Sequence, residues 1–207
     1  MECITNTATV SGLIWSEPVF SHHVLDEDFY TFFIYTERLS ENADRIPVTV
    51  SSRLMIGRPL IPGEQICVRG QFRSYNAIKE NGSSHLVLTL FAKELLLDPP
   101  ASENPNYIYL NGFICRPPVF RRTPFGREIT DILLAVNRAF NKSDYIPTII
   151  WGKNARATAD LPVGTHIALE GRIQSRDYRK KAADGSITTH TAFEVSVGRF
   201  EIIESDV

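Results

Sequence analysis

The sequence has few of the residues that hold small cross-linked or metal-bound proteins together. It contains three cysteines in 207 residues, Cys3, Cys67 and Cys115, with no CxxC or Cys/His spacing. An odd number in this arrangement argues against a disulfide framework and a zinc site, so we interpret them as reduced, partly buried thiols. The amino end has no basic start followed by an apolar segment, and no apolar run approaches the about 18 residues of a membrane span. We expect a soluble, cytoplasmic protein with no membrane contact, metal or cofactor.

Neither sign of charge dominates, and no catalytic motif is present. The chain has 22 Lys+Arg against 24 Asp+Glu and is 43% hydrophobic, which is typical of an ordinary folded protein of one or two domains. It has no P-loop, GxGxxG or HExxH motif. His22 and His23 form a loop pair, and His85, His166 and His190 show no triad spacing. We therefore predict a protein that is not an enzyme.

An internal repeat with a period near one hundred residues organises the chain. The matching segments are Gly12–Ile14 with Gly112–Ile114, Pro18–Phe20 with Pro118–Phe120, and Asp44–Pro47 with Asp144–Pro147. Between the copies lies a stretch rich in Pro and Asn, which is typical of a linker. Two copies at this period indicate a domain duplication. We predict a first domain over residues 1–98, a linker over 99–106 and a second domain over 107–207.

Each copy is predicted to be mostly β, because apolar residues alternate over short runs that end at Gly, Pro or Asn. In the second copy we expect strands over 107–116, 129–138, 144–152, 164–177 and 188–203, and a short helix over 154–161 that Pro162 stops. Five strands with one helix between the third and fourth follow the order of an OB barrel. The predicted fold class is all-β with short helices, as two tandem OB-fold barrels. An Ig-like sandwich would need about seven strands and no helix.

Strand alternation in the second copy separates a core face from a face that carries rings and cations. On the strand 164–177, Ile167, Leu169, Gly171 and Ile173 share the inner face. The outer face carries Ala168, Glu170, Arg172, Gln174, Arg176 and Tyr178. On the strand before the helix, one face holds Ile146, Thr148 and Ile150, and the other holds Tyr145, Pro147, Ile149, Trp151 and Lys153.

Two segments that we expect to be loops add more cations to this outer face. Arg179, Lys180 and Lys181 are placed at a hairpin tip, and Arg121 and Arg122 in the loop after the first strand. Rings interleaved with Arg and Lys suit single-stranded nucleic acid, since bases stack on rings while cations follow phosphates. The other interpretation is that the rings are ordinary packing or interface residues and that the cations form a solvated turn.

Several motifs in the second copy resemble the bacterial single-stranded DNA-binding protein family over residues 105–204. They are Leu134–Arg138, Lys142–Pro147, Trp151–Lys153 and Gly171–Tyr178, in the order and spacing of that family. The resemblance implies an OB barrel on which single-stranded DNA wraps and stacks on aromatic rings. By motif position the implied stacking residues are Phe140, Tyr145, Trp151 and Tyr178. The cations expected to follow the backbone are Arg121, Arg122, Arg138, Lys142, Lys153, Arg172, Arg176, Arg179 and Lys180.

The first copy departs from the family pattern where binding would matter. Ser40, Arg45 and Ser51 stand at the positions of Phe140, Tyr145 and Trp151. Its fourth strand keeps Arg69, Arg73 and Tyr75 on the outer face, which would allow weak backbone tracking. Residues 1–100 hold 8 basic and 12 acidic side chains, net −4, whereas residues 101–207 hold 14 and 12, net +2. We expect the second barrel to bind more tightly than the first.

The resemblance also implies a role and an assembly. We expect sequence-tolerant binding of single-stranded DNA in replication, recombination or repair, in the cytoplasm near the nucleoid, by a homodimer that brings four barrels together. The acidic, apolar tail that recruits partners in the family has no counterpart at Glu204–Val207, so a hub role is in doubt. The alternatives are a primosome-type OB module that binds proteins, and a protein that binds single-stranded RNA.

Overall fold

We analysed a computed structural model of the chain. It describes residues 4–204 apart from 39, 41, 79–81, 83, 103 and 182–184, so Cys3 and residues 205–207 lie outside the described part. The first half contains β1 (Asn6–Ile14), β2 (Val19–Val24), β3 (Glu27–Glu37), β4 (Ala43–Ser51), the 3-10 turn η1 (Ser52–Met55), β5 (Gln65–Ile78) and β6 (Ser84–Leu97). The second half contains β7 (Asn106–Ile114), β8 (Val119–Arg122), β9 (Glu128–Arg138), β10 (Lys142–Trp151), α1 (Lys153–Thr158), β11 (His166–Lys181) and β12 (Ile187–Ile202).

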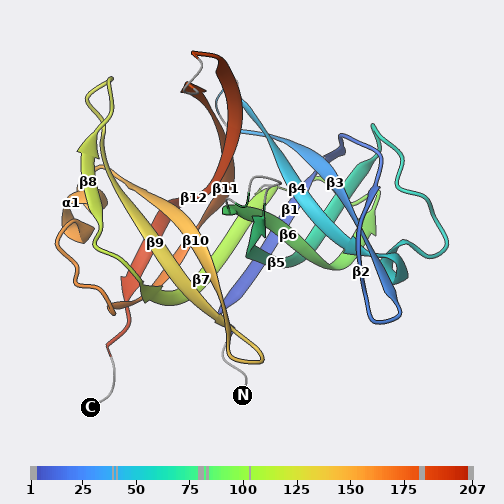
Figure 1. Ribbon diagram of the computed structural model, residues 1–207, viewed down its shortest axis with the longest axis horizontal. Helices are drawn as coiled ribbons and strands as arrows, with labels where there is room; N and C mark the ends of the chain where they lie inside the picture. The colour runs from blue at the N-terminus through green and yellow to red at the C-terminus, as the bar shows by residue number, and fades with distance from the viewer. Residues whose placement is uncertain are drawn as a thin grey trace.

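Each half closes into a barrel by the same pairings (Figure 1). In the first, β1 pairs antiparallel with both β3 and β5, and β4 pairs parallel with β6. In the second, β7 pairs antiparallel with both β9 and β11, and β10 pairs parallel with β12. This architecture confirms the prediction of tandem OB-fold barrels. None of the helices described in the chain is both long and apolar enough to cross a membrane.

Several element boundaries differ from the sequence-based predictions. Arg121 and Arg122 lie in strand β8, which pairs with β9, and not in a loop. The strand β11 runs to Lys181, so Arg179 and Lys180 belong to a long hairpin instead of its tip. The strand β7 begins at Asn106, the last residue of the predicted linker, and α1 is shorter than expected. The strands β8 and β11 extend further than predicted because their backbones pair with β9 and β12. The alternation of side chains along one strand does not reveal such pairing.

The core follows the predicted alternation. Ile167, Leu169 and Ile173 on β11 are buried, as are Ile146 and Ile150 on β10. Two residues assigned to the outer face are also buried, Ile149 on β10 and Ala168 on β11. Ser196 is the Cα partner of Ile149 and accepts a hydrogen bond from the Trp151 indole, so that ring covers this part of the outer face.

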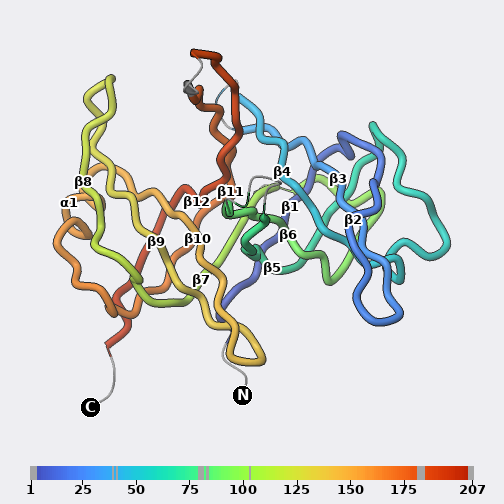
Figure 2. Tube along the Cα trace, in the orientation of Figure 1, coloured from blue at the N-terminus to red at the C-terminus, as the bar shows by residue number. Residues whose placement is uncertain are grey.

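The two barrels share one sheet. Strand β1 pairs antiparallel with β7, with Asn6 opposite Leu110 and Val10 opposite Asn106. This pairing joins all the described strands into a single sheet of twelve. Figure 2 shows the blue trace of β1 running beside the yellow-green trace of β7 between the barrels. The repeat is therefore arranged about an approximate twofold axis that passes between these two strands.

Two buried aspartates bond across that axis. The Asp144 carboxylate accepts the Ser74 N–H at 2.8 Å, and the Tyr145 N–H donates to Ser74 Oγ at 2.7 Å. In the other direction, Asp44 accepts the N–H of Ser175 at 2.6 Å. Asp144 lies inside β10 and ties that strand to the first barrel, because the junction holds backbone N–H groups that need an acceptor.

One buried asparagine in each barrel bonds to the backbone of β5 or β11 just beyond the end of that strand's pairing with β1 or β7. Asn106 donates to the Ile173 carbonyl at 2.7 Å and accepts the Ile173 N–H at 2.9 Å. Asn6 makes the same two bonds to the backbone of Phe72. One amide side chain thus replaces a missing strand partner in each copy.

Replacing Asn106 by Ala should lower the free energy of unfolding by about 2–4 kcal/mol, because a buried N–H and C=O at Ile173 lose their partners. Urea unfolding followed by circular dichroism measures the change. Asn104→Ala, at an exposed position two residues earlier, is the control and should stay within about 0.5 kcal/mol of the native chain. Equal stability of the two variants would contradict the assigned role of Asn106.

Burial raises the pKa of the Asp144 carboxyl above its ordinary value, against the opposing effects of the Ser74 N–H, Arg138 and Arg73. The unfolded chain therefore loses this proton at lower pH than the folded chain, and the free energy of unfolding falls as pH rises through that window. Asp144→Asn, which keeps an acceptor oxygen, should remove this loss. Urea titrations between about pH 4 and 7 should show the stability of the variant rising relative to the native chain; the opposite trend would contradict the raised pKa.

Candidate nucleic-acid interface

Three of the predicted rings of the second barrel lie on the β9–β10 hairpin and along β10. Phe140 sits in the tight turn with a positive φ of 62° and is 95% exposed. Tyr145 is 46% exposed. Trp151 is half-buried, and its Nε1–H donates to Ser196 Oγ at 3.0 Å. A positive φ is energetically unfavourable for a phenylalanine. The ring of Phe140 is almost fully exposed, so its packing in the protein does not compensate for this strain.

Cations flank the same hairpin. Arg138 and Lys142 are Cα partners at the end of the β9–β10 ladder. Lys142 is exposed, and so is Lys153 at the start of α1. Arg138 is half-buried, and its Nη1 lies 3.7 Å from Asp144. The structure therefore brings Phe140, Arg138 and Lys142 together at one end of the barrel.

The fourth predicted ring, Tyr178, lies on the long β11–β12 hairpin that projects from the barrels (Figure 1). Its ring stacks on His190, with centroids 5.6 Å apart. Arg179 and Lys180 are exposed on the same strand. Arg176 is also exposed, and its Nε lies 4.0 Å from Glu194. This hairpin forms a separate arm of rings and cations.

Arg121 and Arg122 are held by acidic neighbours on β9. Arg121 pairs with Asp131, and that hydrogen bond raises the Arg121 pKa. Arg122 Nη2 lies 3.1 Å from Glu128, which Arg156 also contacts. The hydrogen bond that Glu128 accepts from Arg156 has the largest effect on the Glu128 pKa and lowers it; the hydrogen bond from Arg122 lowers it further. A phosphate would have to compete with these carboxylates, so both arginines are weaker candidates than Lys142.

A basic groove crosses the junction between the barrels. It has a volume of about 440 Å³ and is lined by Thr49, Arg73, Tyr75 and Phe91 of the first barrel and by Arg138 of the second. We call it the junction groove. The Arg73 guanidinium lies 3.7 Å from the centroid of Phe91. Burial, and then the nearby Arg138 charge, lowers the Arg73 pKa, and Arg73 donates a hydrogen bond to the neutral Gln71 side chain at 2.9 Å.

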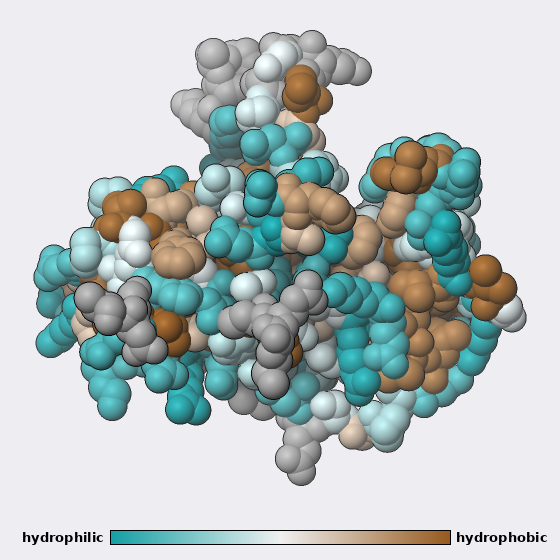
Figure 3. Space-filling view, turned by 90° about the horizontal axis from the view of Figure 1, so that it is seen from below, coloured by the Kyte–Doolittle hydropathy of each residue, from teal (hydrophilic) through white to brown (hydrophobic). Residues whose placement is uncertain are grey.

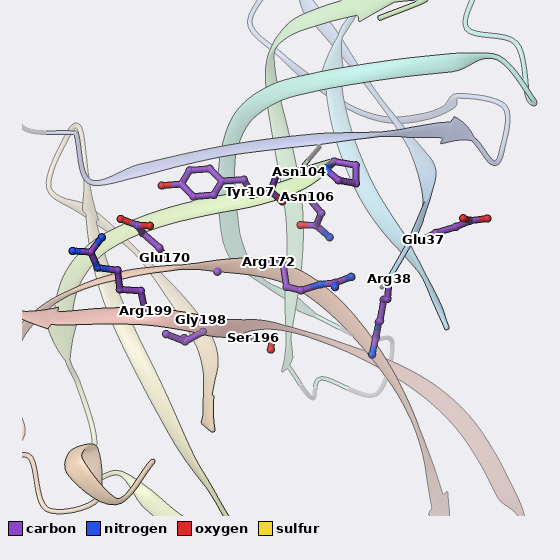
Figure 4. Close-up of a pocket in the computed structure, with 13 residues that line it drawn as sticks. Glu37, Arg38, Asn104, Asn106, Tyr107, Glu170, Arg172, Ser196, Gly198 and Arg199 are labelled. Carbon is purple, nitrogen blue, oxygen red and sulfur yellow. The ribbon is translucent and has the colours of Figure 1, made fainter. Parts of the chain in front are cut away.

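The related position on the other side of the axis is neutralised. Gln174 and Glu194 are Cα partners there, whereas Arg73 and Thr89 are partners in the first barrel. Arg38 donates to Asp44 at 2.6 Å, and Arg172 Nη2 lies 3.4 Å from the same carboxylate. Figure 4 shows Arg172 extending toward Arg38 in a pocket that both residues line. Asp44 therefore already provides an anionic partner for Arg172.

Comparisons with known proteins match the second barrel most strongly. The model of the single-strand binding protein family matches residues 105–203. A single-stranded DNA-binding protein of Clostridium tetani is 39% identical over 83 residues, which are 37% of this chain and 57% of that protein. Single-stranded DNA-binding protein 2 of Streptococcus agalactiae is 31% identical over 107 residues, 48% of this chain and 78% of that protein. The chain belongs to the single-strand binding protein family.

The family model matches the second barrel, whereas the likeness of fold to a solved structure extends over both barrels. The matched segment spans only 57% and 58% of two clostridial relatives. The crystal structure of the single-stranded DNA binding protein from Thermus aquaticus superposes with a TM-score of 0.74 at 18% identity, covering 98% of this chain and 94% of that one. Identity this low shows only that the two chains share the tandem-barrel fold.

The first barrel of this family member carries exposed rings that our sequence comparison did not find. At the compared positions, Ser40 and Arg45 are exposed and Ser51 is buried, so no ring stands there, as expected. Exposed rings occur elsewhere: Tyr75, which was predicted on the outer face, and Trp15, Phe20 and Phe33, which the comparison of the copies did not indicate. We compared the copies position by position, and only alternation along residues 27–37 could have revealed that Phe33 shares an outward face with Tyr35.

Proposed function

We propose that the chain binds single-stranded DNA without catalysis and with little sequence preference, mainly through its second barrel. One observation carries this proposal: Phe140 and Tyr145 are open to solvent beside Arg138 and Lys142. A phenylalanine held almost fully exposed contributes nothing to the core, and every nucleobase has a face that can stack on it. Lys142 and Arg138 supply charge for the phosphates on either side.

The route of the strand follows from the position of the cations. Arg138, on the same hairpin as Phe140, also lines the junction groove. We infer that the sugar-phosphate backbone enters this groove and leaves it past Arg73. The neutralised pocket around Arg38 and Asp44 offers no comparable attraction. The strand therefore crosses the axis on one side only.

The cellular role and the assembly extend this proposal. Family membership supports a role in replication, recombination or repair, and a homodimer would bring four barrels together. Binding of a protein partner on the same rings is an outcome of the measurements below, and binding of RNA is distinguished by titrating an RNA oligonucleotide of the same length in the same assay.

Phe140→Ala should weaken binding of oligo-dT about 5- to 150-fold, which corresponds to the loss of one stacked base at about 1–3 kcal/mol. Fluorescence anisotropy of a labelled oligonucleotide at low salt measures the affinity. The matched control is Phe125→Ala, which removes another phenylalanine that is 93% exposed in a turn but lies outside the predicted set. Equal effects of the two variants would count against the β9–β10 hairpin as the binding surface.

Trp151→Ala should weaken binding far more than Tyr75→Ala, because the second barrel carries the stronger site. The same titration measures both, with thermal unfolding to confirm that Trp151→Ala remains folded after losing the bond to Ser196. Equal losses from two folded variants would contradict the proposed asymmetry. If neither affects DNA binding while a protein partner loses affinity, the ring surface is a protein-binding site.

Arg73→Gln and Arg138→Gln should each reduce the salt dependence of binding. One phosphate contact contributes about 0.7 to the slope of log affinity against log salt on a single strand, so each variant should flatten that slope by about this amount. Arg58→Gln is the control, because that arginine is exposed and already paired with Asp98 and Glu64. An unchanged slope in both junction variants would exclude the groove from the route.

A further inference from the structure

The first barrel presents a compact group of rings and one cation on its outer face. We call Trp15, Phe33, Tyr35 and Arg45 the first-barrel platform. The Trp15 and Tyr35 rings stack with centroids 5.5 Å apart and planes 25° from parallel. The Arg45 guanidinium lies 4.3 Å from the centroid of Trp15. Trp15 is nevertheless 48% exposed and Phe33 36% exposed, so a large part of this aromatic surface is open.

The barrel does not need these rings to fold. In the second barrel, Cys115, Leu133 and Ala135 occupy the positions of Trp15, Phe33 and Tyr35 one hundred residues later. The strand pairings are the same in both copies: Tyr35 faces Arg45 across β3 and β4, and Ala135 faces Tyr145 across β9 and β10. Since smaller side chains serve the same backbone, packing does not explain the exposed rings of Trp15 and Phe33 or the half-buried ring of Tyr35 beside them.

The ring stands on different strands in the two barrels. The second barrel has its ring on β10, at Tyr145, opposite a small residue on β9. The first barrel has its ring on β3, at Tyr35, opposite a cation on β4. Neighbouring strands are about 5 Å apart, so an aromatic surface stays on the same face of the barrel and gains a positive charge beside it.

The platform and the junction groove lie along the same strand. Arg45, Pro47 and Thr49 alternate onto one side of β4; Arg45 is exposed, whereas Pro47 and Thr49 are buried, and Thr49 lines the groove together with Arg73. Four residues of extended strand span about 13 Å. A strand that passes Arg138 and Arg73 is thus led toward Arg45 and Trp15. Figure 3, seen from below, shows a mostly hydrophilic surface with its largest hydrophobic area over the side that holds the first barrel.

We propose that the first-barrel platform is a second nucleobase-stacking site, which holds the same single strand that the second barrel binds, with Arg45 on a backbone phosphate. This inference rests on the proposed function of the second barrel. The first barrel has a net charge of −4 over residues 1–100, so electrostatic attraction is local to the platform and the groove. It therefore binds more weakly and fills after the second barrel.

The chain has two tryptophans, Trp15 and Trp151, so each barrel carries its own fluorescence reporter. Trp151→Phe leaves Trp15 as the sole emitter, and Trp15→Phe leaves Trp151. Each full-length variant is titrated with oligo-dT of about 8 nucleotides, which one OB fold can hold, and of about 35 nucleotides, which can reach both. Stacking should quench Trp151 with either oligonucleotide. Trp15 should be quenched by the long one, at a higher concentration than Trp151.

A second measurement separates contact with DNA from an indirect change in Trp15 emission. Tyr35→Ala and Arg45→Gln should each weaken binding of the long oligonucleotide by about 5-fold or more, and leave binding of the short one unchanged. Phe20→Ala is the matched control, because it removes another exposed ring of the same barrel that packs against Tyr30. It should have no effect on either oligonucleotide.

The outcomes distinguish this inference from the proposed function. Quenching of Trp151 with no response from Trp15, or no effect of Tyr35→Ala and Arg45→Gln, overturns the first-barrel platform and leaves the second barrel as the binding site. No response from either tryptophan and no measurable affinity at low salt overturns both. Quenching of Trp15 with loss of affinity in the platform variants supports the inference.

Discussion

The antiparallel pairing of β1 with β7 is the constraint on which the rest of the structure depends. It converts two barrels into one sheet, and the bonds from Asp44 to Ser175 and from Asp144 to Ser74 fix the angle at which they meet. Each aspartate is buried, so its bonds are costly to break. The junction groove exists only because this arrangement brings Arg138 of one barrel beside Arg73 of the other.

The same scaffold carries two different surfaces, because few of the outward positions are needed for folding. Inner positions match between the copies, as Ile34 and Leu134 do on β3 and β9, both fully buried. Outer positions have diverged in a coordinated way: Tyr35 opposite Arg45 replaces Ala135 opposite Tyr145. At the axis, Arg73 replaces Gln174. Charge at the junction is therefore one-sided, although the backbone around it is nearly symmetric.

The fold could be predicted from sequence because the alternation of side chains and the order of elements can be identified within each copy, and the two copies repeat them. Alternation places Ile167, Leu169 and Ile173 inside, and the order of elements indicates the barrel. The rings of the second barrel were predicted from motif positions. The junction groove and the partners of Asp144 were not predicted, because they join residues about 70 apart through strand pairing between domains. Tyr75 was placed on the outer face by alternation, but the exposed rings of Trp15 and Phe33 were missed, because comparison by position assumes that the copies keep their side chains in the same places.

The joining of β1 to β7 within one polypeptide has a consequence for dilute conditions. Two barrels on separate chains would part as the protein concentration falls, whereas here the second barrel remains at a fixed distance from the first however few molecules are present. A ligand long enough to reach both barrels therefore meets a pair whose spacing was set when the chain folded. Its second attachment depends on the length of the ligand and no longer on the supply of protein.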